Sequence, residues 1–210
     1  KMIEIINMSK KYKELELFDN VNLSFLEGKK ILIKGLNGSG KSVLLKMLVG
    51  YAKPNKGYIK VDGKIIGKNI DFLPNSGVSI NAPEFLNNLS GLDNLLTLAS
   101  IRGIATKESI TNFAKTLGLD TSLNKKYSTY SLGMKQKMRL IQALMDNPEY
   151  LILDEPFDAL DEKSKKVAIK LLSDYIKNDK TLIFTSHDKE DLDFADIVYE
   201  IKDKNLIKIK

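Results

Sequence analysis

The sequence predicts an α/β domain with a mixed, mainly parallel β-sheet, and three observations indicate it. Short apolar segments alternate with amphipathic segments of helical period from about residue 148 onward. A glycine-rich segment, residues 35–42, joins a short apolar segment to a helical one. Residues from about 84 to 147 are nearly all of helical pattern. We therefore expect one domain over residues 1–210, with its core at about 1–83 and 148–210 and a helical subdomain inserted at about 84–147.

Alternating or continuous apolar residues predict the strands. In order along the chain, these segments are residues 3–6, 15–25, 31–33, 57–63, 150–153, 181–185 and 197–201. The Asp62-Gly63 pair predicts a hairpin turn after the fourth segment. Together with the first two strands, this hairpin indicates an antiparallel β-subdomain near the N-terminus.

Segments with a period of about 3.6 residues predict the helices. They cover residues 41–49, 90–102, 106–117, 131–146, 162–177 and 189–195. Ser90 and Thr106 are residue types that cap helix N-termini. Gly50 and Gly118 suit helix C-termini, and Pro148 stops the helix that precedes it.

The composition excludes several classes of protein. The chain has no cysteine, which excludes disulfides and thiolate metal sites and fits a reducing compartment. Its longest apolar stretches are about six residues, far short of the ~20 that a membrane-spanning helix needs. The net charge of +6 comes from scattered lysines, which indicates a solvated surface, so no nucleic-acid partner is expected. Attraction to an anionic membrane surface stays open.

The glycine-rich segment fits the phosphate-binding pattern G-x-x-x-x-G-K-[ST]. Its residues are Gly35-Leu36-Asn37-Gly38-Ser39-Gly40-Lys41-Ser42. Glycines let the backbone turn its N–H groups inward around phosphate oxygens, and the helix that follows adds its positive dipole end. Lys41 is expected to reach the β- and γ-phosphates, and the Ser42 hydroxyl to bind Mg²⁺. A glycine-rich turn without a ligand is the alternative, but a chance match is on the order of 1%.

Two carboxylates close the apolar strand at residues 150–153. We expect Asp154 to hold Mg²⁺, directly or through water. Glu155 would then lie within reach of a water molecule that attacks the γ-phosphate. The alternative is a pair of surface carboxylates that cap the strand or the next helix, and the phosphate-binding segment argues against it.

A third segment decides the class of nucleotide-binding protein. Tyr130-Ser131-Leu132-Gly133-Met134-Lys135-Gln136 resembles the signature motif of ABC-transporter ATPases, whose common form is L-S-G-G-Q. Ser131 and Gly133 match that form, whereas Tyr130, Leu132 and Met134 depart from it. The form Y-S-L-G-M-K-Q is similar to that of the bacitracin-resistance and lantibiotic-immunity type. Residues 83–95 also follow the family's pattern. The resemblance implies a P-loop NTPase core with an antiparallel β-subdomain and an inserted helical subdomain.

The resemblance also implies that the active site is shared between two chains. In this family the signature residues face the γ-phosphate held by a second subunit, so two ATP molecules lie within a head-to-tail homodimer or heterodimer. The signature residues here are Ser131, Leu132, Gly133 and Met134. An ordinary capped helix at residue 131 is the alternative.

Further residues match the family by position. Tyr12 matches the aromatic residue that stacks on adenine, and Asp158 and Asp161 match the D-loop, with Asp161 at the dimer contact. His187, the only histidine, matches the switch residue that contacts the γ-phosphate and holds Glu155 and the water in line. The catalytic residues implied are Lys41, Glu155 and His187. The ATP-binding residues implied are Tyr12, Gly35, Asn37, Gly38, Ser39, Gly40, Lys41, Ser42 and Val43.

The sequence departs from the family at two functional positions. Asn81 stands where the Q-loop glutamine normally touches Mg²⁺ or the attacking water. It keeps the carbonyl oxygen but is one methylene shorter, so we expect a water-bridged contact to the metal or a slower enzyme. Val43 stands where a hydroxyl usually helps to hold the α-phosphate, and its loss should weaken binding by about 0.5–1.5 kcal/mol.

The expected function is the ATP-binding and ATP-hydrolysing subunit of a membrane transporter, working in export with a separate transmembrane permease. Its cofactors would be ATP and Mg²⁺, and it would lie in the cytoplasm on the inner face of the cell membrane. The groove for the permease is expected near residues 81–95, with residues 127–130 close by. Alternatives are a non-transport ATPase of the same superfamily that acts on nucleic acid or ribosomes, and a non-hydrolytic regulatory protein. The first usually has a coiled-coil insert or two fused ATPase domains, and Glu155 and His187 argue against the second.

Overall fold

The computed structural model describes residues 2–81, 85–177, 179–188 and 190–210. Its strands are β1 (Met2–Tyr12), β2 (Leu15–Leu26), β3 (Lys30–Lys34), β4 (Lys56–Val61), β5 (Lys64–Ile65), β6 (Ser76–Ser79), β7 (Tyr150–Leu153), β8 (Thr181–Thr185), β9 (Ile197–Lys202) and β10 (Asn205–Lys208). Its helices are α1 (Lys41–Val49), α2 (Gly91–Arg102), α3 (Lys107–Thr116), α4 (Leu132–Leu144), α5 (Glu162–Ile176) and α6 (Asp191–Phe194). Between α3 and α4 the chain forms 3₁₀ turns at Asp120–Ser122 and Tyr127–Thr129.

Within these residues the strands form two sheets. The antiparallel sheet has the order β2-β1-β4-β5, and the larger sheet has the order β10-β9-β3-β8-β7-β6. In the larger sheet, β3 pairs in parallel with β8 and β9, and β7 pairs in parallel with β8 and β6. Only the β9–β10 pair there is antiparallel among the described strands. The prediction of a mixed, mainly parallel sheet beside an N-terminal antiparallel unit is confirmed.

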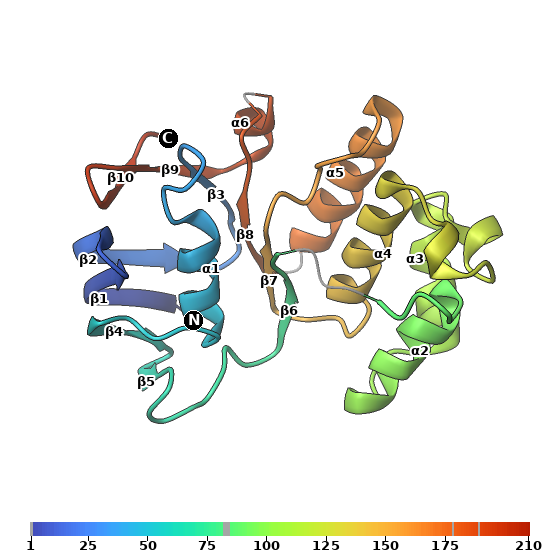
Figure 1. The fold of residues 1–210 in the computed structure, drawn as a ribbon, viewed down its shortest axis with the longest axis horizontal. Helices are drawn as coiled ribbons and strands as arrows, with labels where there is room; N and C mark the ends of the chain where they lie inside the picture. The colour runs from blue at the N-terminus through green and yellow to red at the C-terminus, as the bar shows by residue number, and fades with distance from the viewer. Residues whose placement is uncertain (1, 82–84, 178, 189) are drawn as a thin grey trace.

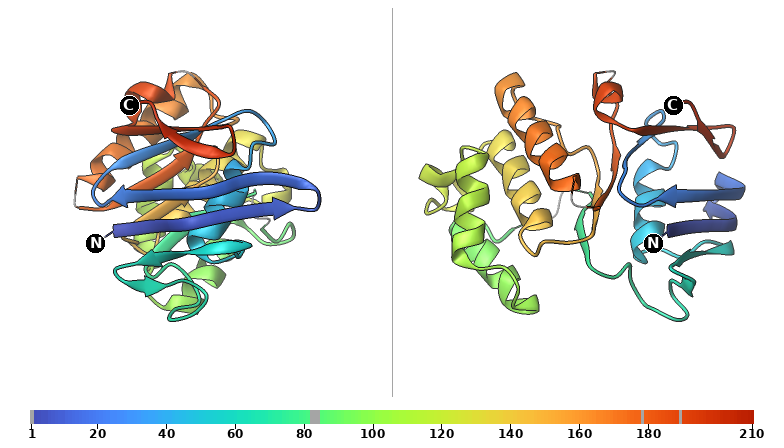
Figure 2. Two further views of the ribbon diagram at one scale, coloured as in Figure 1. Left: turned by 90° about the vertical axis from the view of Figure 1, so that its left-hand side faces the viewer. Right: turned by 180° about the vertical axis from the view of Figure 1, so that it is seen from behind.

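The central strands of the larger sheet are buried on both faces because a separate hydrophobic core lies against each. Ile31 and Ile33 of β3 belong to the core that contains α1 and the antiparallel sheet, whereas Leu32 belongs to the core that contains α2 to α5. Figure 1 shows α1 between the two sheets and α4 and α5 on the opposite side, and Figure 2 shows the same layers from behind. Tight packing on both faces fixes the positions of the strand ends.

Polar side chains begin the long helices as the sequence predicts. Ser90 accepts a hydrogen bond from the backbone of Asp93, and Thr106 forms a capping box with Ser109. Gly118 follows α3 with a φ of +65°, the left-handed conformation of a helix C-terminus. Among the described helices, none combines the length and apolar character that crossing a lipid bilayer requires.

The structure adds strands that the sequence pattern did not predict. β6 contains Val78 as its single large apolar residue, which is too little for a recognisable alternation, and parallel pairing with β7 holds it in the sheet. β10 pairs with β9 at the end of the chain, and β1 continues to Tyr12 rather than ending at residue 6. Helix α6 is shorter than the predicted segment, whose Lys189 lies outside the described residues. The predicted subdomain boundary at residues 83–84, and Pro83 of the family pattern, also lie outside them.

Gly77→Ala is expected to destabilise the fold. A Cβ atom at position 77 would lie 1.9 Å from the Ala143 carbonyl oxygen of α4 and 2.8 Å from Pro148 Cγ. Strand β6 or helix α4 must therefore move, and the free energy of unfolding should fall by about 2–3 kcal/mol in urea denaturation. Gly63→Ala is the control, because its Cβ would meet nothing within 4 Å and only the φ of +79° opposes it, at a cost of about 1 kcal/mol. Equal small losses in both variants would contradict the close packing of β6 on α4.

Candidate functional site

The carboxyl ends of β3, β8, β7 and β6 meet at one edge of the larger sheet. Their parallel register pairs Ile33 with Thr185, Leu153 with Phe184, and Ser79 with Leu153, so the segments that follow these strands emerge together. A cavity of about 700 Å³ opens at this edge. It is lined by Tyr12, Leu15, Leu17, Asn37, Gly38, Gly40, Lys41, Ser42, Val43, Lys46, Asn81, Gln136, Arg139, Asp154, Glu155 and Asp158.

The glycine-rich segment curls around the start of α1. Gly38 and Gly40 have φ values of +80° and +103°, a region that residues with a side chain rarely adopt. Lys41, the first residue of α1, is buried, and its Nζ donates hydrogen bonds to the carbonyl oxygens of Gly35 at 3.0 Å and Leu36 at 3.3 Å. An ammonium group and a helix N-terminus thus share one loop, an arrangement that favours anions.

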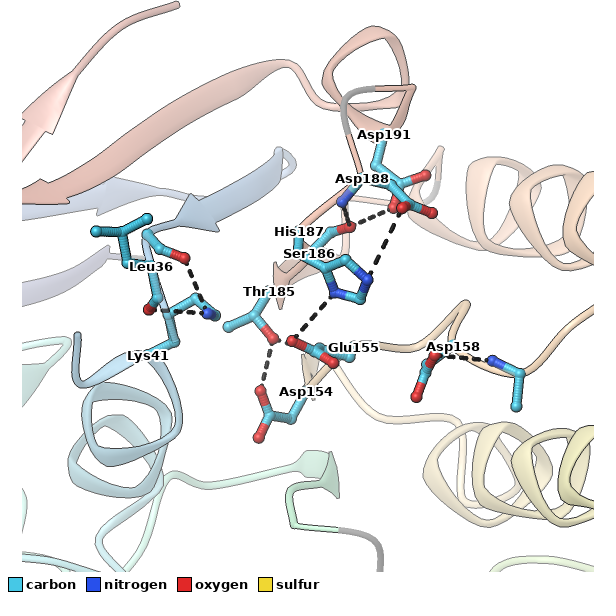
Figure 3. A network of polar contacts seen from close by, with 12 residues as sticks. Leu36, Lys41, Asp154, Glu155, Asp158, Thr185, Ser186, His187, Asp188 and Asp191 are labelled. Carbon is cyan, nitrogen blue, oxygen red and sulfur yellow. Dashed lines mark hydrogen bonds and ion pairs between the residues drawn. The ribbon is translucent and has the colours of Figure 1, made fainter. Parts of the chain in front are cut away.

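Thr185 holds the two carboxylate residues at the end of β7. Its hydroxyl donates to Asp154 Oδ1 at 2.6 Å and accepts from the backbone N–H of Glu155 at 2.9 Å. Glu155 has a φ of +48°, so the backbone turns sharply between the two carboxylates. Figure 3 shows that the Asp154 and Glu155 side chains point in different directions, with Glu155 directed towards His187.

His187 lies beside Glu155, with 3.5 Å between Nδ1 and the carboxylate oxygen Oε1. The residues on either side of it are tied down. Ser186 Oγ donates to Asp191 Oδ2 at 2.5 Å and accepts from the backbone N–H of Asp188 at 3.0 Å. The imidazole itself is more than half exposed, so a fixed backbone presents a side chain that an adjacent ligand can reach.

Lys165 of α5 forms ion pairs with two carboxylates of the chain around His187, residues 186–188 and 191, which we call the histidine segment. Its Nζ lies 2.9 Å from both Asp188 Oδ2 and Asp191 Oδ1, and the Asp191 side chain is only 1% exposed. Burial alone would lower the pKa of Lys165, but hydrogen bonds to Asp188 and Asp191 outweigh it and raise the pKa. The hydrogen bond from Lys165 in turn lowers the pKa of Asp188. Lys165 and Asp188 are therefore charged at neutral pH, and the contacts of Lys165 attach the histidine segment to α5.

The structure brings most of the predicted nucleotide-binding residues to the main cavity. The exceptions are Gly35, which lines an adjacent cavity of about 580 Å³ together with His187, and Ser39, whose buried hydroxyl has no hydrogen-bond partner among the described residues. His187 and Glu155 also line a smaller cavity of about 220 Å³. These cavities are adjacent because Asn37, Glu155 and His187 each border two of them.

The predicted signature residues lie outside these cavities. Ser131 caps α4 by accepting a hydrogen bond from the backbone N–H of Met134 at 3.2 Å. Leu132, the first residue of α4, is 73% exposed. Asp161 caps α5 through the backbone N–H of Ser164, a hydrogen bond that lowers the Asp161 pKa. The chain thus presents a helix N-terminus outward, away from its own phosphate-binding loop.

Sequence reasoning missed three residues of the site. They are Thr185, Gln136 and Arg139. Thr185 and Gln136 bind the turn formed by residues 154–156, which we call the carboxylate turn, and Gln136 and Arg139 line the main cavity. A polar residue at the carboxyl end of a fully buried strand was a signal for Thr185. Gln136 closes the segment that resembles the signature motif, but the resemblance gave it no role of its own. Arg139 gave no signal, since a helix normally carries polar residues.

The main cavity offers oxygen donors that fit a magnesium ion bound together with a phosphate ligand. The Ser42 hydroxyl and the Asp154 carboxylate both line it, and Asn81 adds an amide oxygen. Within the described residues, no group of three or more His, Cys, Asp or Glu side chains forms a complete metal site. Mg²⁺ usually keeps waters and substrate phosphates among its ligands, so a small donor set suits it.

Comparison with known families gives a match over most of the chain. The family model described as ABC transporter matches residues 18–158. A protein of Bacillus subtilis named uncharacterized ABC transporter ATP-binding protein YybJ is 36% identical over 201 residues, which cover 95% of this chain and 92% of that protein. The bacitracin transport ATP-binding protein BcrA of Enterococcus faecalis is 34% identical, covering 99% and 68%. The lantibiotic transport ATP-binding protein SrtF of Streptococcus pyogenes is 29% identical, covering 96% and 88%.

Solved structures agree with the sequence matches. The ATP-binding cassette MJ0796, in a dimeric post-hydrolysis state bound to ADP and Pi, superimposes with a TM-score of 0.86 at 25% identity and covers 99% of both chains. A dimeric structure described as MJ0796, a bacterial ABC transporter cassette, gives a TM-score of 0.86 at 26% identity.

Lys165→Met is expected to lower the free energy of unfolding by about 2–4 kcal/mol, because it leaves the buried Asp191 carboxylate without its cation. Urea denaturation at neutral pH measures this loss. Lys166→Met is the matched control, since its partner Glu162 is 91% exposed and such pairs contribute about 0.5 kcal/mol or less. Similar stability losses in the two variants would contradict the attachment of the histidine segment through Lys165.

Proposed function

Since the chain belongs to the ABC transporter family and is an ATP-binding subunit with ATPase activity, we propose that it drives export through a separate transmembrane permease. Two copies, or this chain and a related one, enclose two ATP molecules head to tail. ATP binding closes the pair and hydrolysis reopens it. The chain works in the cytoplasm, peripherally on the inner face of the cell membrane.

The observation that carries this proposal is that the glycine-rich loop and the carboxylates face one cavity, while the start of α4 is exposed outside it. Lys41, Asp154 and Glu155 line one cavity, whereas Ser131 and Leu132 are exposed outside it. A serine hydroxyl and free N–H groups at a helix N-terminus bind anions. We infer that this surface binds the γ-phosphate held by the partner, with Gly133 and Met134 beside it. The dimeric cassettes to which the chain is similar support this arrangement.

The nucleotide is proposed to lie along the main cavity. The adenine stacks on Tyr12, a 63% exposed ring at the end of β1 beside the apolar Leu15 and Leu17. The phosphates lie within the glycine-rich segment, where Lys41 leaves the loop carbonyls for the β- and γ-phosphates. Val43 offers no hydroxyl to the α-phosphate, so ATP binding is weaker by about 0.5–1.5 kcal/mol than with a threonine there.

Ser42 and Asp154 are the proposed Mg²⁺ ligands. Mg²⁺ held by these two residues would supply positive charge that neutralises charge developing on the phosphate oxygens. Thr185 orients Asp154, because its hydroxyl donates to the carboxylate. Asn81 would contact the metal through a bridging water. Its φ of +54° suits asparagine, which adopts the left-handed conformation more readily than glutamine.

Glu155 and His187 are the proposed groups that act on the attacking water. The Glu155 carboxylate accepts a proton from that water. At the same time the water oxygen bonds to the γ-phosphorus, and the bond between the γ-phosphorus and the ADP oxygen breaks. His187 is close enough to Glu155 to orient the carboxylate, and it donates to the γ-phosphate as charge moves onto it. Asp158 and Asp161 follow Glu155 along the chain and are proposed to contact the partner.

The helical subdomain, about residues 84–147, is proposed to pass the closing motion to the permease. Asn81 lies where the core leads into this subdomain, so its contact with the site would sense the permease. The groove for the permease is proposed near residues 81–95, with residues 127–130 close by. Two relatives are named for bacitracin and lantibiotic transport, and on that basis the exported compound is an antimicrobial peptide or a lipid-like molecule.

Glu155→Gln is expected to bind ATP normally, to hydrolyse it at least about 100-fold more slowly, and to accumulate as a dimer, because the amide cannot accept the proton. Size-exclusion chromatography with saturating ATP and Mg²⁺ measures the dimer, and phosphate release measures turnover. A Glu155→Gln protein that stayed monomeric at saturating ATP would count against the two-chain site.

His187→Ala is expected to lower kcat by about 100-fold while the Kd for ATP changes by less than about threefold, because the histidine acts on charge that develops during the reaction. Steady-state turnover and equilibrium binding measure the two quantities. Near-normal turnover in this variant would remove the role assigned to the imidazole.

A further inference from the structure

We propose that Gln136 of helix α4, supported by Arg139, is a positioning residue that sets the orientation of the Glu155 carboxylate. Hydrolysis therefore requires α4 to be packed against the end of β7. The inference rests on the role proposed for Glu155. It assigns a function to side chains of α4 that line the nucleotide cavity behind the exposed start of the helix.

Gln136 binds the backbone of the carboxylate turn directly. Its side chain is buried, with 5% exposure, and its Nε2 donates to the carbonyl oxygens of Glu155 at 3.2 Å and Pro156 at 2.9 Å. The amide oxygen accepts a hydrogen bond from Arg139 Nη1 at 3.0 Å. Arg139 lies one helical turn further along α4, so it fixes which end of the amide faces the turn.

The turn that Gln136 binds needs external support. Glu155 has a left-handed φ of +48°, which is unfavourable for a residue with a side chain. Thr185 of β8 binds its N–H, and Gln136 of α4 binds its carbonyl oxygen, which also accepts from the backbone N–H of Asp158 at 3.2 Å. Two different elements therefore fix the peptide groups on either side of Glu155, and the direction of its carboxylate follows from them.

Through its position on α4, Gln136 connects the turn at Glu155 to the exposed N-terminus of the same helix. Ser131, the N-cap residue of α4, lies five residues earlier, about 7–8 Å along the same rigid helix. One helix thus carries the exposed residue proposed to bind the partner's nucleotide and the amide that holds Glu155. A shift of α4 relative to β7 changes both together. The Glu155 carboxylate is correctly oriented only while α4 is packed against the end of β7. Hydrolysis at the site that contains Glu155 is thereby linked to closure at the site where Ser131 binds the partner's nucleotide.

The test compares two substitutions that remove the donor but keep the length of the side chain. Gln136→Met removes the amide, and Gln136→Glu keeps the acceptor for Arg139 but cannot donate to the carbonyl oxygens. Both are expected to lower kcat about 10- to 100-fold, with KM for ATP changed by less than about threefold. Gln142→Met is the control on the same helix, and its kcat should stay within about twofold of the unchanged chain.

A double-mutant cycle separates positioning from a general structural effect. In the Glu155→Gln background, Gln136→Met should cause no further loss of single-turnover rate beyond about threefold, because the group on which it acts is already absent. The inference would be overturned if the two substitutions lowered the single-turnover rate multiplicatively, or if a folded Gln136→Glu protein had a normal kcat. A Glu155→Gln protein with normal turnover would instead overturn the proposed function. If Gln136→Met does not fold, Gln136→Glu carries both comparisons.

Discussion

The parallel register of β3, β8 and β7 is the constraint on which the rest of this structure depends. These strands are buried on both faces, between the core around α1 and the core beneath α4 and α5. Packing on two sides fixes where each strand ends. The phosphate-binding loop, the two carboxylates and the histidine segment each follow directly after one of these strands. Their mutual distances are therefore set by the sheet.

Because of the turn at Glu155, the two carboxylates at this edge of the sheet point in different directions. A regular strand would send consecutive side chains to opposite faces, where packed helices lie. The left-handed φ at Glu155 instead directs its carboxylate to His187, while Asp154 remains on Thr185 and faces the loop that holds Lys41. The proposed roles in proton transfer and metal binding thereby belong to adjacent residues with separate surroundings. The strain of the turn is offset by hydrogen bonds from two neighbouring elements.

Sequence alone predicted the parts of the site that are encoded in contiguous residues. The glycine-rich segment, the acidic strand end and the helix caps are local patterns, and each lies where a local argument places it. Thr185 and Gln136 act across 30 and 19 residues of chain, and such contacts exist only once the sheet and α4 are packed. β6 was missed for a related reason, since Gly77 is required by the approach of α4 rather than by strand propensity. The left-handed conformation of Asn81 likewise belongs to the folded chain.

In the proposed arrangement, this chain supplies half of each ATP site and a second chain supplies the other half. The most direct measurement is a structure of the Glu155→Gln protein with ATP and Mg²⁺, from which the distance between the γ-phosphate oxygens and the nearest serine hydroxyl of a signature segment is read. We expect a hydrogen-bonding distance of about 3 Å to Ser131 of the partner subunit. A nucleotide whose phosphates contact residues of one chain alone would contradict it.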